Sequence, residues 1–124
     1  MENRELKIGN WVEQPNTGPQ QVTAILNDIQ IKTTSGHVDK YCRRIPLSEK
    51  WLDMFGCTTH YTGTQKEYET PNPEIIIKVF VYTKETLFFV NYRGTDIKRI
   101  EFVHQLQNLW FELTEEELII EKII

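Results

Sequence analysis

A stripe of apolar residues near the C-terminus constrains the fold of this chain more than any other feature. Five side chains form it: Val103, Leu106, Leu109, Trp110 and Leu113. They recur after three, three, one and three residues, which is the spacing of one face of an α-helix. The spacing predicts an amphipathic helix over residues 103–113 whose apolar side packs against a core.

The first third of the chain predicts short β-strands. Four runs rich in strand-forming residues are separated by turn residues: Lys7–Val12, Gln21–Leu26, Ile29–Thr33 and His37–Arg44. The separators are the Pro15–Pro19 cluster, Asn27-Asp28 and Ser35-Gly36, all residues that favour tight turns. Four short strands joined in this way predict a small curled sheet, similar to an SH3-like barrel.

A short helix and an antiparallel hairpin are expected next. Ser48 is a good N-cap for a helix over Glu49–Phe55, and Gly56 is a natural stop. The polar stretch 58–73 is predicted to be a loop or a weak hairpin. Three further strands follow: Ile75–Tyr82, Leu87–Tyr92 and Ile97–Phe102. Continuous apolar runs in the first two of these strands predict burial on both faces. The tail 115–124 is expected to form a last strand or a short helix.

Length and composition then set the class. The chain has 124 residues, of which 40% are hydrophobic, and this is an ordinary globular balance. We expect an α+β fold in one compact domain spanning residues 1–124. Its sub-parts are the SH3-like strands of residues 1–47, and a second part of residues 48–124 that holds the antiparallel strands and the C-terminal helix.

The charge and the N-terminal sequence point to a cytoplasmic protein. A net charge of −4 opposes sequence-independent binding to nucleic-acid phosphates. The first residues lack the apolar segment of a secretory signal, and the longest apolar runs are too short to cross a bilayer. We therefore expect the bacterial host cytosol, no membrane partner, and two free thiols at Cys42 and Cys57.

Four soft metal ligands leave one alternative open. His37, Cys42, Cys57 and His60 lie within 24 residues, and zinc accepts two thiolates and two imidazoles. Only the Cys57–His60 pair has the close spacing of a structural zinc site. The spacing therefore favours two buried thiols and two surface histidines, with no metal and no cofactor.

Motifs of catalysis are sparse. His60-Tyr61-Thr62 is half of the paired H-x-T signature of two-histidine phosphoesterases, and no second H-x-T or H-x-S follows. No phosphate-binding loop, nucleophile elbow or H-E-x-x-H motif is present. An enzyme is disfavoured, although a small hydrolase of nucleotides or phosphoesters, using His60 or His104 with nearby carboxylates, remains an alternative.

The C-terminal third offers a candidate binding site. Five residues are expected to contact a ligand: Tyr92, Arg93, His104, Gln105 and Asn108. The first two end a predicted strand, and the others lie on non-core faces of the predicted helix, beside Gln107. Aromatic faces can stack on a planar ligand, Arg can bind a phosphate or carboxylate, and amides can bind base edges. The alternative is that these polar groups face solvent or cap neighbouring strands.

Three segments resemble a family of small proteins encoded by phages, prophages and mobile elements of Bacteroides-like bacteria. They are Glu5–Val12, Ile45–Leu52 and Val103–Thr114, and the last is similar to the family pattern V-H-Q-L-Q-N-L-Y-F-A-L-T-G-E-E-L. Trp110, Glu112 and Glu115 depart from that pattern. The family has no assigned activity, so the resemblance implies a phage context and transfers no catalytic residues.

The resemblance and the sparse catalytic motifs together suggest a function. One class of small phage proteins sequesters nucleotide second messengers made by bacterial immune systems. By analogy of context, we expect a non-enzymatic, homo-oligomeric protein that captures a small anionic, nucleotide-like ligand. The alternative binding role is an SH3-like module that holds a protein or DNA partner through residues 7–44.

Overall fold

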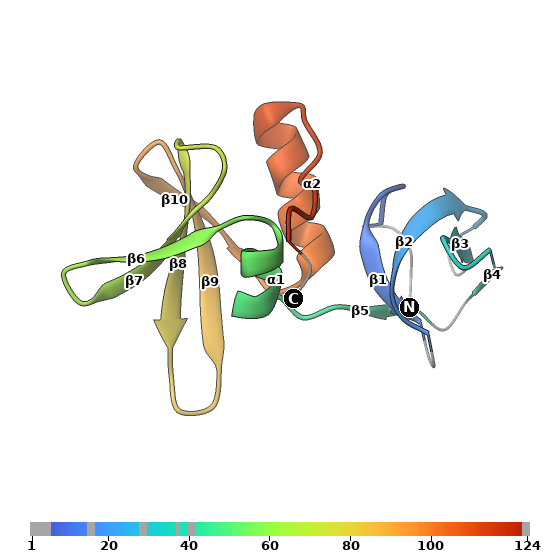
Figure 1. Ribbon diagram of the computed structural model, residues 1–124, viewed down its shortest axis with the longest axis horizontal. Coiled ribbons are helices and arrows are strands. Elements are labelled where there is room, and N and C mark those ends of the chain that lie inside the picture. Colours follow the sequence, from blue (N-terminus) through green and yellow to red (C-terminus); the bar gives the residue numbers. More distant parts are fainter. Residues whose placement is uncertain (1–5, 15–16, 28–29, 37, 40–41, 123–124) are drawn as a thin grey trace. The chain divides into compact units, whose positions relative to one another are not determined.

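The computed structural model (Figure 1) shows an α+β protein with two antiparallel sheets, a short helix and a C-terminal helix, which confirms the predicted class. The structure describes residues 6–14, 17–27, 30–36, 38–39 and 42–122. The chain divides into two compact units. Unit 1 comprises Met1–Pro46 and Phe102–Glu117, and unit 2 comprises Leu47–Glu101 and Leu118–Ile124. The C-terminal helix thus belongs with the N-terminal strands.

Unit 1 contains an open antiparallel sheet. Its strands are β1 (Trp11–Gln14), β2 (Gly18–Ile25), β3 (Ile31–Thr33), β4 (Val38–Asp39) and β5 (Arg43–Arg44), in the order β4-β3-β2-β1-β5. Among the described residues, no pairing joins the end strands β4 and β5. The predicted curled, SH3-like barrel is therefore wrong. Closing a barrel needs a continuous ladder, and end strands of two residues each do not supply one.

The start of β1 differs from the prediction because a turn precedes it. Asn10 N–H donates to the Lys7 carbonyl over 3.0 Å, and Gly9 adopts a left-handed backbone with φ 94°. A side chain at that φ is disfavoured, so glycine suits the turn. The strand predicted from Lys7 consequently begins at Trp11. The predicted strand His37–Arg44 is divided into β4 and β5, with residues 37 and 40–41 outside the described part.

Helix α2 (Val103–Thr114) confirms the predicted amphipathic helix and extends it by one residue. Its stripe is buried at Val103, Leu106, Leu109 and Trp110, while Leu113 is half-buried. The sheet of unit 1 contributes a buried cluster of its own: Leu6, Val12, Val22, Ile31 and Cys42. The burial of four of the five stripe residues accounts for the apolar periodicity on which the helix prediction rests.

Unit 2 begins with the predicted short helix, α1 (Glu49–Met54). The Ser48 hydroxyl accepts a hydrogen bond from Trp51 N–H, and Gly56 ends the helix with φ 83°. Trp51 and Leu52 are buried, and the Trp51 and Phe55 rings lie 5.8 Å apart. The N-cap and the glycine stop are both confirmed.

The sheet of unit 2 is antiparallel throughout (Figure 1). Its strands are β6 (Thr58–Thr62), β7 (Gln65–Glu69), β8 (Ile75–Val81), β9 (Thr86–Tyr92) and β10 (Thr95–Ile100), in the order β10-β9-β8-β7-β6. The polar stretch 58–73 therefore contains a hairpin of two five-residue strands, β6 and β7, which confirms the hairpin alternative and not the loop. The predicted hairpin of β8 and β9 and the strand after it are confirmed, with ends shifted by one or two residues.

Strand β8 is buried along one face only. Along β8 the buried residues Ile75, Ile77 and Val79 alternate with half-exposed Ile76, Lys78 and Phe80. The prediction that β8 and β9 are covered on both faces is therefore wrong. The apolar run has another cause: on the more open face, apolar side chains cover one another, as where the Phe80 and Phe89 rings meet edge to face at 5.4 Å.

The tail, as far as it is described, forms neither helix nor strand over residues 115–122, contrary to both expectations. From Leu118 onward it nevertheless belongs to unit 2. Leu118 is buried, and the N–H groups of Glu121 and Lys122 donate to the Met54 carbonyl over 2.7 and 3.0 Å. None of the helices in the described part of the chain has the length and apolar character needed to cross a membrane.

The attachment of the tail predicts the effect of an added methyl group at Gly56. A Cβ at this position would clash with the Glu121 carboxylate, and the backbone φ of 83° disfavours any side chain. Gly56→Ala should lower the free energy of unfolding by about 1–2 kcal/mol, as measured by urea denaturation. In a Glu121→Ala background the loss should be smaller, because the clash is gone. An equal loss in both backgrounds would show that Glu121 does not lie against Gly56.

Candidate functional site

The structure buries two residues of the polar face predicted for helix α2. The His104 side chain is 0% exposed and Gln107 is 8% exposed, so the placement of both on non-core faces is wrong. Gln105 and Asn108 are half-buried. The buried side of the helix is therefore wider than its apolar stripe. A polar group on that side needs a hydrogen-bond partner within the protein.

Gln107 finds its partners in the chain just before and within β1. Its Oε1 accepts a hydrogen bond from Trp11 N–H over 2.8 Å, and its Nε2 donates to the Gly9 carbonyl over 3.0 Å. Beside it, Asn108 Oδ1 accepts from Asn10 Nδ2 over 2.8 Å. The Gln107 amide thus binds one backbone N–H and one backbone carbonyl. Asn108, the next residue, binds Asn10 in the turn that precedes β1.

These contacts lie where the pairing of β1 with β5 ends. The ladder joins Glu13 to Arg43 and Val12 to Arg44. An antiparallel ladder would continue with Trp11 opposite Ile45. Instead, Trp11 N–H donates to Gln107, and the Ile45 carbonyl accepts from Val103 N–H over 2.8 Å. Helix α2 therefore takes the hydrogen bonds that a longer β5 would have made.

The first turn of α2 also uses its polar residues internally. Gln105 Oε1 accepts from Phe102 N–H over 3.1 Å, which satisfies a backbone donor at the helix start. The His104 ring stacks on the Phe102 ring at 5.9 Å, and the Arg44 guanidinium lies 5.4 Å from the centre of that same Phe102 ring. Three polar residues of α2, Gln105, Gln107 and Asn108, therefore form hydrogen bonds within unit 1.

Tyr92 and Arg93, the other two predicted ligand-binding residues, lie in unit 2 at the turn between β9 and β10. Arg93 has a left-handed φ of 52°, and its guanidinium lies 4.9 Å from the centre of the Tyr92 ring. It forms an ion pair with Glu74, which raises the pKa of Arg93 above its ordinary value. The five predicted residues therefore belong to two units, two in unit 2 and three in unit 1.

The proposed metal ligands are likewise divided. His37 is outside the described residues, Cys42 belongs to unit 1, and Cys57 and His60 belong to unit 2. Both cysteines are buried, and neither is part of a disulfide. Burial, helped by the nearby carboxylates of Asp53 and Glu121, raises the pKa of Cys57 to about 12. Within the described residues, no cluster of three metal-binding side chains is found.

His60 lies between two carboxylates on the β6–β7 hairpin. Its Nδ1 is 3.5 Å from Glu69 Oε1, and its Nε2 is 3.9 Å from Glu67 Oε2. Both distances exceed those of a good hydrogen bond. The imidazole, 34% exposed, is thus in weak contact with Glu67 on the facing strand and with Glu69 diagonally across from it.

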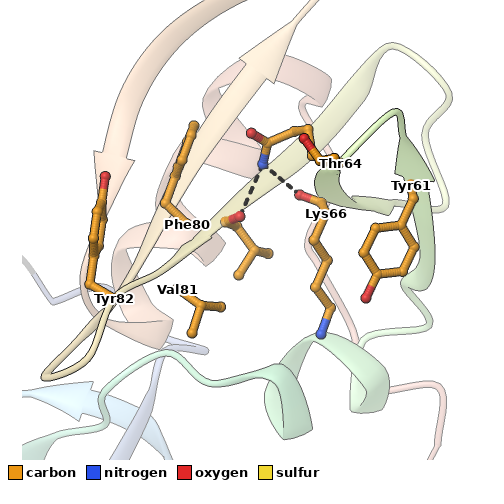
Figure 2. A pocket seen from close by; sticks show the side chains of 8 residues that line it. Tyr61, Thr64, Lys66, Phe80, Val81 and Tyr82 are labelled. Carbon is orange, nitrogen blue, oxygen red and sulfur yellow. Dashed lines mark hydrogen bonds between the residues drawn. The ribbon is translucent and has the colours of Figure 1, made fainter.

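A pocket of about 430 Å³ in unit 2 is the better candidate for a binding site. This volume is within the usual range for small-molecule sites. Eight residues from β6, β7, β8 and the adjoining turns line it: Tyr61, Thr64, Gln65, Lys66, Val79, Phe80, Val81 and Tyr82. Figure 2 shows Tyr61 and Tyr82 on opposite sides in that view, with Lys66 and Val81 between them. The two tyrosines are 62% and 57% exposed.

Two features hold the pocket in shape. Gln65 Nε2 donates to the carbonyls of Lys66 and Val79 over 2.9 and 3.0 Å (dashed lines in Figure 2), which ties β7 to β8. Lys66 extends toward α1 and pairs with Glu49. This pair lowers the pKa of Glu49 and raises the pKa of Lys66. Glu49 also accepts a hydrogen bond from the Tyr68 hydroxyl over 3.0 Å.

Comparison of the chain with protein-family models, with curated proteins and with solved structures finds no match. The candidate site therefore rests on its geometry. Sequence reasoning missed it because Tyr61 and Lys66 belong to the polar stretch taken for a loop or weak hairpin. The signal that could have found them is the Gly63-Thr64 turn, flanked by Thr and Tyr on one side and by alternating polar residues on the other.

The role of Gln107 predicts a large effect on stability. Gln107→Met keeps the length of the side chain but leaves Trp11 N–H without its acceptor. It also removes one of the two donors to the Gly9 carbonyl, the other being Gln21 Nε2. We expect a loss of about 1–3 kcal/mol in the free energy of unfolding, measured by urea denaturation. The matched control is Glu112→Met on an exposed position of the same helix, which should change stability by less than about 0.5 kcal/mol. Equal effects of the two variants would contradict the assignment.

Proposed function

We propose that this protein is a non-enzymatic binding protein that sequesters a small anionic, nucleotide-like ligand in the pocket of unit 2. One observation carries the proposal: Tyr61, Tyr82 and Lys66 line the same 430 Å³ pocket. Exposed aromatic rings stack on planar ring systems, and an ammonium group attracts phosphate or carboxylate. A nucleotide combines both kinds of group in one molecule.

The Lys66–Glu49 pair sets the electrostatics of binding. The Lys66 side chain lines the pocket, is 25% exposed and forms an ion pair with Glu49. An ammonium group has three donors, and a bound anion can therefore share it with the carboxylate. Glu49 nevertheless competes with the ligand for Lys66, and its own charge repels an anion.

The phage-type resemblance supports the choice of ligand class. It suggests a nucleotide-derived immune signal of the bacterial host as the physiological ligand. The predicted residues on α2 are no longer the preferred contacts, because Gln105 and Asn108 are engaged within unit 1 and His104 is fully buried. The contacts proposed for the ligand are therefore Tyr61, Lys66 and Tyr82.

The proposal predicts opposite effects from the two members of the ion pair. Lys66→Gln should weaken ligand binding about tenfold or more, a loss of roughly 1.4 kcal/mol. Glu49→Gln should strengthen binding, because it removes the competing charge and keeps an acceptor for Tyr68. Lys98→Gln, which changes an exposed lysine outside the pocket, should leave the dissociation constant unchanged. Isothermal titration calorimetry with cyclic mono-, di- and trinucleotides would measure all three effects.

Heating the loaded protein then separates binding from catalysis. The proposal requires that the nucleotide released on unfolding is chemically unchanged when analysed by chromatography and mass spectrometry. A protein that takes up no nucleotide of the panel would contradict it. Hydrolysed product that disappears in His60→Ala would instead establish the hydrolase alternative.

A further inference from the structure

The two edges of the sheet in unit 2 differ in a way that bears on assembly. An edge strand presents unpaired backbone N–H and C=O groups, and proteins usually guard such edges with charges, prolines or bulges. Strands β6 and β10 are the edges of this sheet. They lie at the two ends of the strand order, beyond β7 and β9.

Strand β10 is guarded. Its pairing with β9 shifts register between Asp96 and Lys98, which marks an irregularity around Ile97. Lys98 and Arg99 are exposed next to this shift, and Asp96 pairs with Lys78 over 3.1 Å. Charges and a broken register together make this edge a poor template for another strand.

Strand β6 lacks these features. It pairs with β7 at five consecutive positions, from Thr58 opposite Glu69 to Thr62 opposite Gln65, without a register shift. Its sequence, Thr-Thr-His-Tyr-Thr, contains no proline and no Lys, Arg, Asp or Glu, and threonine and tyrosine favour strands. Thr58, Thr59, Tyr61 and Thr62 are exposed.

We propose that β6 pairs with β6 of a second copy of this chain, in antiparallel orientation about His60. Thr58 of one copy then lies opposite Thr62 of the other, and Thr59 lies opposite Tyr61. The two His60 rings face each other, each with the carboxylates of Glu67 and Glu69 beside it. No pair of like-charged Lys, Arg, Asp or Glu residues is brought together.

The difference between the edges also limits the assembly to two copies. Antiparallel pairing of β6 is isologous, because the same strand is used by both chains, and it consumes the bare edge of each. The outer edges of the joined sheet are then the two β10 strands, which resist further pairing. A closed dimer follows, and not a fibre. A five-residue strand buries little area, so the dimer should be weak.

Sedimentation of the full chain over a concentration series tests this proposal. The wild type should show a reversible monomer–dimer equilibrium. Thr58→Lys combined with Thr62→Lys places like charges opposite each other twice, and should weaken dimerisation about tenfold or more. Thr58→Lys combined with Thr62→Glu places opposite charges there and should restore the dimer. Thr95→Lys, on β10, should leave dimerisation unchanged.

Hydrogen exchange provides the local readout. Those amides of residues 58–62 that point away from β7 should exchange more slowly at high protein concentration in the wild type, and not in the double-lysine variant. The charge-swapped variant controls for unfolding, since it carries as many substitutions on the same strand. A wild type that stays monomeric, or a dimer that the double-lysine variant leaves intact, would overturn the proposal. Failure of ligand binding would not affect it, because Thr58 and Thr62 are not among the residues that line the pocket.

Discussion

The architecture of unit 1 depends on the hydrogen bonds that the Gln107 side-chain amide forms with the backbone of Trp11 and Gly9. Strand β1 loses its β5 partner after Val12, where the ladder stops at Arg44. A strand in the interior of a sheet cannot leave its backbone groups unpaired without a cost in free energy. Gln107 Oε1 supplies the missing acceptor to Trp11 N–H, and its Nε2 is a second donor to the Gly9 carbonyl beside Gln21 Nε2. At the helix start, Val103 N–H donates to the Ile45 carbonyl. Helix α2 thereby provides hydrogen-bond partners for backbone groups of the sheet that β5 does not pair.

Because of these hydrogen bonds, the amide-rich sequence of α2 no longer indicates a ligand-binding surface. A polar residue on a helix is a candidate for ligand binding only if its groups are accessible, and Gln105, Gln107 and Asn108 are committed to partners within unit 1. We therefore propose the ligand site in unit 2, where two exposed tyrosines and a lysine line one pocket. In that proposal, an anionic ligand meets Lys66 while it is paired with Glu49.

The sequence predicted the elements that depend on local patterns. Helix α2 follows from apolar spacing, α1 from Ser48 and Gly56, and the β8–β9 hairpin from its β-branched and aromatic runs. It did not predict the burial of His104 and Gln107, because the partners of Gln107 are as far as 98 residues away in the sequence. The pocket escaped prediction for a similar reason, since it requires the register that places Lys66 opposite Val79.

Native-state hydrogen exchange of the Trp11 amide tests the central claim most directly. This N–H lies beyond the last β1–β5 pair and donates to a side chain. If Gln107 completes the ladder, the Trp11 amide should exchange as slowly as the amides paired within the β1–β2 ladder, and therefore open only with unit 1 as a whole. Exchange at the rate of an unprotected amide would contradict the account, because it would show that α2 does not take over the ladder where β5 ends.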